Sequence, residues 1–400
     1  MFKEKSILLG VSGGIAAYRS AELVRLLVKA GASVRVVMTA NAAQFVTPLT
    51  FQTLSANPVG TDLFSLESES RIGHIHQARL ADLVILAPAT ANLMAKMAAG
   101  IADDYLTTTL LATTAPVLIC PAMNTKMWEH PATQRNLKTL AELGHRICEP
   151  ATGSLACREE GPGRLAELGD IIEAAVRILT PPTLAGKRVL VSAGPTWEPF
   201  DPVRFLSNPS SGKMGYALAR IAARRSARVH LVSGPCALDA PAGVERVCVK
   251  TALEMRDAVA SLAPGMDVIV MAAAVSDYRP AATAPQKVKK IPEKQAVAME
   301  ANPDILAALG KVKPHAQVLV GFAAETENLL ENAGEKLAAK NLDFIVANDL
   351  TKKGSGFGAD TNEVKILDRH GKVTELPPLT KDEVAGEIWD RVEQILACGT

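Results

Sequence analysis

The sequence predicts an α/β protein made of two tandem, doubly wound domains. Apolar runs of strand length end at glycine or proline and are followed by segments with helical spacing, a pattern typical of parallel sheets covered by helices. This scheme runs through the first half of the chain and starts again near residue 187. We therefore expect domains at 1–180 and 187–400, joined by a linker at 181–186 within the Pro/Gly stretch TPPTLAGKR. One large α/β domain is the alternative.

Composition excludes several classes of protein. The chain has 400 residues, of which 48% are hydrophobic and 21% are charged, and its net charge is +1. This balance argues against a nucleic-acid groove or a polybasic membrane surface. No apolar run reaches the roughly 20 residues that span a bilayer, and the N-terminal MFKEKSILLGVSGG is predicted to be a first strand, not a signal peptide. The six cysteines form no CxxC pair, so neither a disulfide framework nor a zinc site is indicated, and a cytoplasmic location is expected.

The first half begins with a strand, a turn and a helix. The apolar run ILLGV at 7–11 is followed by the turn SGG and by helical spacing from Ile15 to Gly31. Further strands are expected at 34–38, 83–88 and 116–121. Loops at the carboxyl ends of such strands are where open α/β sheets place ligands.

The turn GVSGGIAAY suits a phosphate group. A helix N-terminus offers unpaired N–H groups and about half a positive charge, and glycine lets the backbone approach a phosphate closely. The turn is not GxGxxG, and no ribose-binding acid follows about 20 residues later, which disfavours a nicotinamide dinucleotide. A mononucleotide such as a flavin phosphate fits better, and a plain tight turn stays open.

The second half repeats the scheme and closes with a hairpin. Strands are expected at 189–194, 227–234, 267–273, 317–325 and 343–349. The segment EVKILDRHGKVTEL is predicted to form a hairpin with His370-Gly371 at its turn.

The segment SNPSSGKMGYALA at 207–219 opens a small-residue helix in this half. It is not a P-loop, because Met214 follows the lysine where a magnesium-binding hydroxyl is needed and no glycine lies five residues before Gly212. Its glycine and hydroxyls at a helix start still suit a phosphate. Lys213 either adds charge to that site or is a surface lysine of the first turn.

Longer motifs resemble a known family. The first half contains GHIHQARLADLVILAPATANLMAKMAAGIADD, CPAMNTKMW and GSLACREEGPGRL, in the order seen in flavin-dependent phosphopantothenoylcysteine decarboxylases. The second half contains AGPTWEPFDPVRFLSNPSSGKMG, AAAVSDYRP, QKVKK, NPDIL, GFAAET and AND, and is similar to phosphopantothenate–cysteine ligases. From about residue 5 to 395 the chain resembles the bacterial bifunctional enzymes of coenzyme A biosynthesis. The resemblance implies two Rossmann-like domains, an N-terminal flavoprotein fold and a C-terminal nucleotide-binding ligase fold.

The resemblance implies three catalytic residues for the decarboxylase. His74 in GHI would act beside FMN in the oxidative step, Asn124 in PAMN would hold the departing carboxylate, and Cys157 in SLAC would donate the last proton. Each has a plainer alternative: His74, like His76, could be a surface residue, and Asn124 could simply cap a helix. Cys157 lies among small and turn residues, unlike a buried structural cysteine, which favours a mobile flap with a reactive thiol.

The resemblance also implies ligand contacts in the first half. FMN would be bound by Ser12, Gly13, Gly14, Ile15 and Thr39, and substrate by Ala89, Thr90, Ala91, Asn92 and Met123. The family's usual PASANT is PATANL here, so Leu93 departs from it.

For the ligase, the resemblance implies that CTP activates 4′-phosphopantothenate as an acyl-cytidylate before cysteine attacks. Asn208 would recognise the acyl carbonyl, and Lys287 would neutralise the leaving pyrophosphate from a basic lid that also contains Lys289 and Lys290. The remaining CTP contacts would be Ser210, Ser211, Gly212, Met271, Ala272, Ala273, Asp277, Pro303, Asp304, Ile305, Leu306, Phe322, Lys336 and Lys340. Trp197 replaces an arginine of some relatives.

The implied partners are small molecules: 4′-phosphopantothenate, cysteine and CTP, with FMN and with Mg²⁺ or Mn²⁺ whose protein ligands are unassigned. No nucleic acid or membrane is expected. The family implies a homo-oligomer with trimeric flavin domains and dimeric ligase domains, joined into a dodecamer. Two rivals stay open: a flavin-binding regulatory protein of the same fold that has lost its chemistry, and a peptide cysteine decarboxylase, which would not need a CTP-using half.

Overall fold

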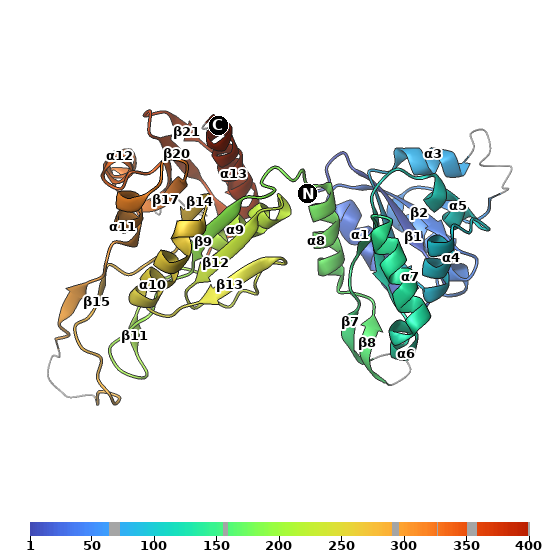
Figure 1. Ribbon diagram of the computed structural model, residues 1–400, viewed down its shortest axis with the longest axis horizontal. Helices are drawn as coiled ribbons and strands as arrows, with labels where there is room; N and C mark the ends of the chain where they lie inside the picture. Colours follow the sequence, from blue (N-terminus) through green and yellow to red (C-terminus); the bar gives the residue numbers. More distant parts are fainter. Residues whose placement is uncertain (64–72, 155–158, 290–295, 326, 350–357, 399–400) are drawn as a thin grey trace. The chain divides into compact units, whose positions relative to one another are not determined.

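The chain divides into two compact units, Met1–Thr180 and Pro181–Thr400. The computed structural model describes residues 1–63, 73–154, 159–289, 296–325, 327–349 and 358–398 (Figure 1). Within these ranges, the helices are too short or too polar to cross a membrane. Each unit is described here by itself.

The first unit is built on a parallel six-stranded sheet with the order β3-β2-β1-β4-β5-β6. Both neighbours of β1 run parallel to it, with Ile7 opposite Val34 on one side and Leu83 on the other. The strands are β1 (Ser6–Val11), β2 (Ser33–Met38), β3 (Val59–Gly60), β4 (Leu83–Ala89), β5 (Val117–Pro121) and β6 (Arg146–Ile147). The expected strands at 7–11, 34–38, 83–88 and 116–121 are confirmed.

Helices cover both faces of this sheet because its strands are apolar on both sides. On one face, Leu9 and Val11 pack with residues of α1, α2 and α8, and on the other Leu8 and Leu86 pack with α4, α5 and α7. The helices of the unit are α1 (Ala17–Lys29), α2 (Pro48–Ser55), α3 (Gly73–Leu80), α4 (Ala91–Ala99), α5 (Tyr105–Ala112), α6 (Thr125–Glu129), α7 (Pro131–Glu142) and α8 (Leu168–Leu179), with a 3-10 turn at Ala42–Gln44. A hairpin of β7 (Ala151–Ser154) and β8 (Glu160–Arg164) stands apart from the sheet.

The second unit repeats this order in an eight-stranded sheet, β13-β12-β9-β14-β17-β18-β20-β21. Its strands are β9 (Arg188–Ala193), β12 (Arg228–Ser233), β13 (Val244–Cys248), β14 (Val268–Met271), β17 (Val318–Glu325), β18 (Phe344–Asp349), β20 (Val364–Asp368) and β21 (Val373–Glu375). The first six are parallel, and β20 and β21 add the predicted antiparallel hairpin, with Gly371 at a φ of +80° in its turn. All five strands expected in this half are confirmed.

Helices again cover both faces of the sheet. On one face lie α9 (Lys213–Arg224) and α13 (Lys381–Cys398), where the indole Nε1 of the buried Trp389 donates to the carbonyl of Leu218 at 2.9 Å. On the other lie α10 (Ala252–Leu262), α11 (Ile305–Val312) and α12 (Leu329–Ala339), and a 3-10 turn spans Ala263–Gly265. Short antiparallel pairs flank the sheet: β10 (Glu198–Pro199) with β11 (Phe205–Leu206), β15 (Tyr278–Pro280) with β16 (Met299–Ala301), and β19 (Thr361–Asn362) with β22 (Leu379–Thr380).

This strand order defines a ligand site in each unit. The chain winds outward in opposite directions from β1 and β4 in the first unit, and from β9 and β14 in the second. Crevices at such switch points, beyond the carboxyl ends of the strands, are the usual binding sites of doubly wound folds. The loops after these four strands are therefore the places to search for function.

Candidate functional site

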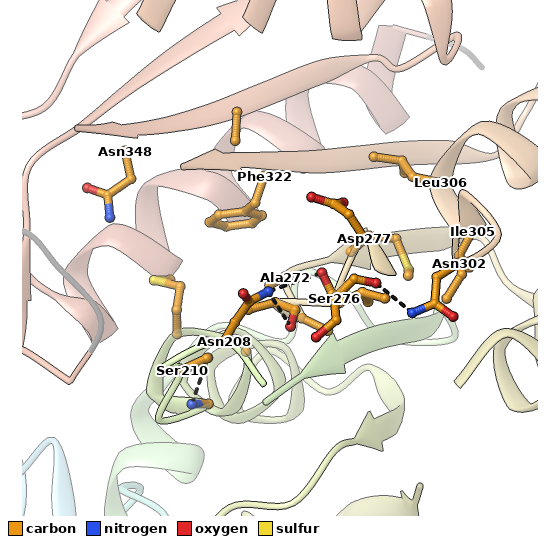
Figure 2. A pocket seen from close by; sticks show the side chains of 18 of the residues that line it. Asn208, Ser210, Ala272, Ser276, Asp277, Asn302, Ile305, Leu306, Phe322 and Asn348 are labelled. Atoms are coloured by element: carbon orange, nitrogen blue, oxygen red, sulfur yellow. Dashed lines mark hydrogen bonds between the residues drawn. The ribbon is translucent and has the colours of Figure 1, made fainter. Parts of the chain in front are cut away.

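The second unit contains a cavity of about 730 Å³ at its switch point. The loops after β11, β14 and β16 contribute to its wall, together with residues of β17 and β18 and the start of α9. Most residues expected to bind CTP line it: Asn208, Ser210, Ser211, Gly212, Met271, Ala272, Ala273, Asp277, Pro303, Asp304, Ile305, Leu306, Phe322 and Lys340. Figure 2 shows Asn348 and Ser210 toward one end of this cavity, Ile305 and Asn302 toward the other, and Phe322 between them.

The glycine turn before α9 forms one wall. Gly212 has a φ of +77°, which a non-glycine residue adopts only with strain, and an added Cβ would lie 3.4 Å from the backbone of Gly194. The hydroxyl of Ser210 accepts from the Gly212 N–H at 3.3 Å (Figure 2). No side chain caps α9, so its first N–H groups can bind an anion.

Asn208 is fixed in the middle of the cavity. Its Nδ2 donates to the carbonyls of Ala274 and Val275 at 3.2 Å each, which orients the amide (Figure 2). Because both amide hydrogens point at backbone carbonyls, Oδ1 is the atom that is left to accept from a ligand.

The other end of the cavity carries carboxylates. Asp304 caps α11 by accepting from the Ala307 N–H at 2.9 Å, and it pairs with Lys340 Nζ at 2.8 Å. Burial raises the pKa of Asp304, but the hydrogen bonds from Lys340 and Ala307 outweigh that effect, so the net pKa is lowered and the carboxylate stays charged. The carbonyl of Asp277 accepts from the Asn302 N–H at 2.7 Å, which ties the loop after β14 to β16.

Two expected CTP residues do not line the cavity. Lys336 lies on α12, whereas Lys340 ends that helix and reaches the wall. Lys287 is exposed, and its segment is anchored through its neighbour Val288, whose N–H donates to Asp201 Oδ2 at 3.2 Å and whose carbonyl accepts from Arg204 Nη2 at 2.7 Å. The described part of the basic segment is thus tied to the β10–β11 loop, and Lys290 lies outside the described residues.

Sequence reasoning missed several residues of the cavity wall. Lys381 lines it, as do Asn348, Asn362, Asn302 and Ser276, and so does Lys213, whose role the sequence left open. Lys213 Nζ donates to Asp360 Oδ1 at 2.6 Å, and Lys381 Nζ donates to Asn362 Oδ1 at 2.9 Å. The AND motif pointed to Asn348, but no local pattern marks Lys381, which lies at the start of the last helix.

The first unit holds its glycine turn through Ser12. The Ser12 hydroxyl donates to the Pro88 carbonyl at 2.7 Å and accepts from the Thr90 N–H at 2.9 Å, which ties the ends of β1 and β4 together. Ser12 is 2% exposed, so its side chain positions the turn. No side chain caps α1, but the N–H groups of Ala17, Tyr18 and Arg19 at its start donate to the carbonyls of Gly14, Ile15 and Ala16. A phosphate would therefore have to bind at the glycine turn before the helix. Thr39 follows β2 and accepts from the Ala42 N–H at 3.2 Å.

The expected substrate segment follows β4. Ala89 ends the strand, Ala91 and Asn92 begin α4, and Thr90 caps that helix by accepting from the Leu93 N–H at 3.3 Å. Leu93, the departure from the family pattern, is buried in the core. A leucine is accommodated there because it faces the core and not the loop.

Asn124 both caps a helix and binds a carboxylate. Its Oδ1 accepts from the Lys126 N–H at 2.8 Å, as the plainer interpretation expected, and its Nδ2 donates to Glu159 Oε2 at 2.6 Å. Capping therefore aims the Nδ2 group, and the contact with Glu159 shows that it can hold a carboxylate. Glu159 precedes β8, so this bond links the loop after β5 to the hairpin.

Cys157 falls between β7 and β8 in the sequence, and residues 155–158 lie outside the described residues. The base of the β7–β8 hairpin is docked tightly: the Met123 N–H donates to the Gly163 carbonyl at 2.8 Å, and a Cβ on Gly163 would lie 2.3 Å from the Met123 carbonyl oxygen. The described arms are strands, which the small and turn residues of this segment did not predict.

The aromatic contacts place two further residues. The ring of His74, on α3, meets the ring of Tyr105 edge-on with centroids 6.5 Å apart. In the second unit, Trp197 stacks on Phe205 at 4.2 Å, which explains how tryptophan is accommodated at this position. In the described ranges, no three His, Cys, Asp or Glu side chains gather as a metal site would require.

Comparisons with known proteins agree with this architecture. A family model described as "Flavoprotein" matches residues 1–180, and one described as "DNA/pantothenate metabolism flavoprotein C-terminal domain" matches residues 184–396. The Coenzyme A biosynthesis bifunctional protein CoaBC of Bacillus subtilis (strain 168) is 49% identical over 396 residues, covering 98% of this chain and 97% of that protein. The protein of that name from Escherichia coli (strain K12) is 47% identical over 388 residues, covering 96% of this chain and 95% of its own.

Two solved structures are also similar. The C-terminal domain of a Coenzyme A biosynthesis bifunctional protein CoaBC is 44% identical and covers 54% of this chain and 98% of its own, with a TM-score of 0.47. The FMN-dependent cysteine decarboxylase SpaF is 35% identical and covers 44% of this chain and 99% of its own, with a TM-score of 0.38. On the matches of its two halves and its full-length relatives, the chain belongs to the family of the bifunctional coenzyme A biosynthesis proteins, with a flavoprotein domain followed by a DNA/pantothenate metabolism flavoprotein C-terminal domain.

Proposed function

We propose that this chain catalyses two consecutive steps of coenzyme A biosynthesis. The second unit would ligate cysteine to 4′-phosphopantothenate with CTP, and the first unit would decarboxylate the product to 4′-phosphopantetheine with FMN. The observation that carries this proposal is the full-length match to bifunctional relatives, together with a cavity at the switch point whose wall contains most of the residues expected to bind CTP.

In the ligase, activation joins the substrate carboxylate to the α-phosphate of CTP and releases pyrophosphate. The Asn208 Oδ1 faces the place where that acyl group would form, because the backbone fixes the other end of the amide. Lys287 would neutralise the pyrophosphate as it leaves, and Lys340, held by Asp304, would contact the nucleotide. A divalent cation would enter with the triphosphate, since the described residues offer no cluster of ligands for it.

In the decarboxylase, the glycine turn before α1, with Gly13, Gly14 and Ile15, would bind the flavin phosphate, and Thr39 would adjoin it. Bound FMN would supply the oxidation of the thiol end that makes loss of carbon dioxide possible, and would return the electrons afterwards.

The residues of this chain would orient the reacting groups. Asn124 Nδ2 would hold the carboxylate, exchanging Glu159 for the substrate. His74 would adjoin the flavin in the oxidative step, and Cys157 would donate the final proton. Ala89, Thr90, Ala91, Asn92 and Met123 would line the substrate path between β4 and β5.

A coupled reaction tests the proposal. Wild-type protein, supplied with 4′-phosphopantothenate, cysteine, CTP and Mg²⁺, should form 4′-phosphopantetheine with one CMP and one pyrophosphate per turnover, measured by mass spectrometry. It should also purify with bound FMN. Ligation without decarboxylation by FMN-loaded protein would contradict the decarboxylase activity proposed for the first unit. Decarboxylation of supplied 4′-phosphopantothenoylcysteine without ligation would contradict the ligase activity proposed for the second unit.

We further propose that the chain works in the cytoplasm as a homo-oligomer with trimeric flavin units and dimeric ligase units. Large apolar side chains on the first unit support an assembly, since Ile15, Tyr18 and Leu49 are 59%, 63% and 69% exposed. Light scattering would measure how many copies assemble in the full chain, in residues 1–180 and in residues 181–400.

A further inference from the structure

Two lysines meet at one end of the ligase cavity. Lys213 begins α9 and Lys381 begins α13, and both line the cavity near Gly212 and Asn348. They come from helices about 170 residues apart in the chain that pack on the same face of the sheet. The first N–H groups of α9 point to the same end, because α9 starts at Lys213 without a side-chain cap.

Among the described residues, Lys381 is a buried cation with little counter-charge. The residue is 8% exposed, and the hydrogen bond that the structure describes for its Nζ goes to a neutral amide, Asn362 Oδ1, at 2.9 Å. Asp360, a carboxylate whose charge acts on Lys381, is 88% exposed and is bound to Lys213. Burial lowers the pKa of Lys381, and the charge of Lys213 lowers it further, while Asp360 only partly opposes this. A buried ammonium in such surroundings is costly unless an anion completes it.

The geometry of the cavity limits which anion this is. Of the residues expected to bind the nucleotide, Ile305 and Leu306 lie at the opposite end, with Phe322 and Asn208 between (Figure 2). Ser210, Ser211 and Gly212 were also expected to bind CTP but lie at the lysine end, so we reassign them from the nucleotide to the acid substrate. The acid substrate carries its carboxylate at one terminus and a phosphate monoester at the other. If its carboxylate reacts beside Asn208, its phosphate extends away from the nucleotide and toward Lys213 and Lys381.

We propose that Lys381, with Lys213 and the uncapped start of α9, binds the phosphate monoester of the acid substrate and selects it over the unphosphorylated acid. This inference rests on the proposed ligase activity. On binding, the phosphate dianion replaces Asp360 as the partner of Lys213 and supplies a negative counter-charge for the Lys381 ammonium. Asn362 orients the Lys381 ammonium toward the phosphate. Lys381 therefore acts on substrate specificity at the phosphate end of the acid and does not touch the reacting carboxylate at the other end.

Steady-state ligation by the full chain tests this. Lys381→Met should raise the KM for 4′-phosphopantothenate and lower its kcat/KM by about ten- to a hundredfold, the loss expected for a charge-assisted hydrogen bond. The KM for CTP should stay near the wild-type value, and kcat/KM for pantothenate should change little. The ratio of kcat/KM for 4′-phosphopantothenate to kcat/KM for pantothenate should therefore fall. Lys381→Arg should keep part of that preference. Lys311→Met, at an exposed position of α11, is the matched control and should behave as wild type.

Several outcomes would overturn the inference. A rise in the KM for CTP would assign the lysines to the triphosphate, and an equal loss with both acids would make Lys381 merely structural. If Lys381→Met does not fold, the two acids can be compared with Lys213→Met instead, because the Lys213 side chain is 36% exposed and its loss should not unfold the protein. Wild-type protein that ligates neither acid would instead refute the proposed function, so the two failures are distinguishable.

Discussion

Replacing Gly163 with alanine should disable the first unit's chemistry and spare the second unit. The new Cβ would lie 2.3 Å from the Met123 carbonyl oxygen, and ordinary contacts begin near 3.4 Å, so the hairpin and the loop after β5 must separate by roughly 1 Å. The φ of +133° adds strain of about 1–3 kcal/mol for a residue with a side chain. Asn124 follows Met123, so it moves with the loop. A displacement of about 1 Å at a positioned group costs roughly a hundredfold in rate.

The assay separates the two reactions. Decarboxylation of supplied 4′-phosphopantothenoylcysteine should fall about a hundredfold, while pyrophosphate release in the ligase reaction should stay within about twofold of wild type because the site lies in another unit. Gly169→Ala is the matched control: it lies in α8 of the same unit, and its added Cβ would meet nothing within 4 Å. Wild-type decarboxylation by Gly163→Ala would refute the argument that the hairpin base positions Asn124.

Three further predictions concern the second unit and the join. Lys287→Gln should block pyrophosphate release from CTP by about a hundred- to a thousandfold yet still convert supplied acyl-cytidylate, and wild-type release would make Lys287 a solvated surface charge. Asp343→Asn should lower the free energy of unfolding by about 3–5 kcal/mol, because it leaves the buried Lys313 ammonium, now 2.5 Å from Asp343, without that carboxylate. Lys313→Met should lower it by less. Urea denaturation measures both losses, and equal losses would contradict the prediction. Residues 1–180 should purify yellow and residues 181–400 colourless, each active alone, and two unfolded fragments would contradict the separability.

The sheet of each unit was predictable because its strands carry their signal locally. Runs such as LVILAP are buried on both faces, so they are continuously apolar and short, and proline or glycine marks their ends. The helix after β1 was predicted as well, but Ile15 and Tyr18 of its apolar spacing are exposed. Periodicity indicates the helix and does not tell whether an apolar position faces the core or another surface.

The hairpins and the lysine end of the cavity were not predictable in this way. The strands β7 and β8 contain glycine, threonine and serine instead of alternating apolar residues, since they pack on a loop and not on the core. Lys381 has no local signal, because it reaches the cavity only when α13 packs beside α9. Lys336 shows the reverse: the resemblance implied a CTP contact for both Lys336 and Lys340, but of the two only Lys340, at the end of the helix, lines the cavity.

Both units have a glycine turn before the helix that follows the first strand of the sheet, yet the surroundings of the two turns differ in a way that suits the proposed ligands. A flavin must stay bound through turnover, whereas the product of ligation keeps its phosphate and must leave. At the start of α9, Asp360 already holds Lys213 at 2.6 Å and is 88% exposed, so it can return to that lysine when the phosphate departs. Exchanging one charged partner for another keeps the net free energy of binding small, although each hydrogen bond is strong. The pair of lysines therefore provides selectivity for the phosphate, and Asp360 limits the affinity so that the product can move on to the decarboxylase.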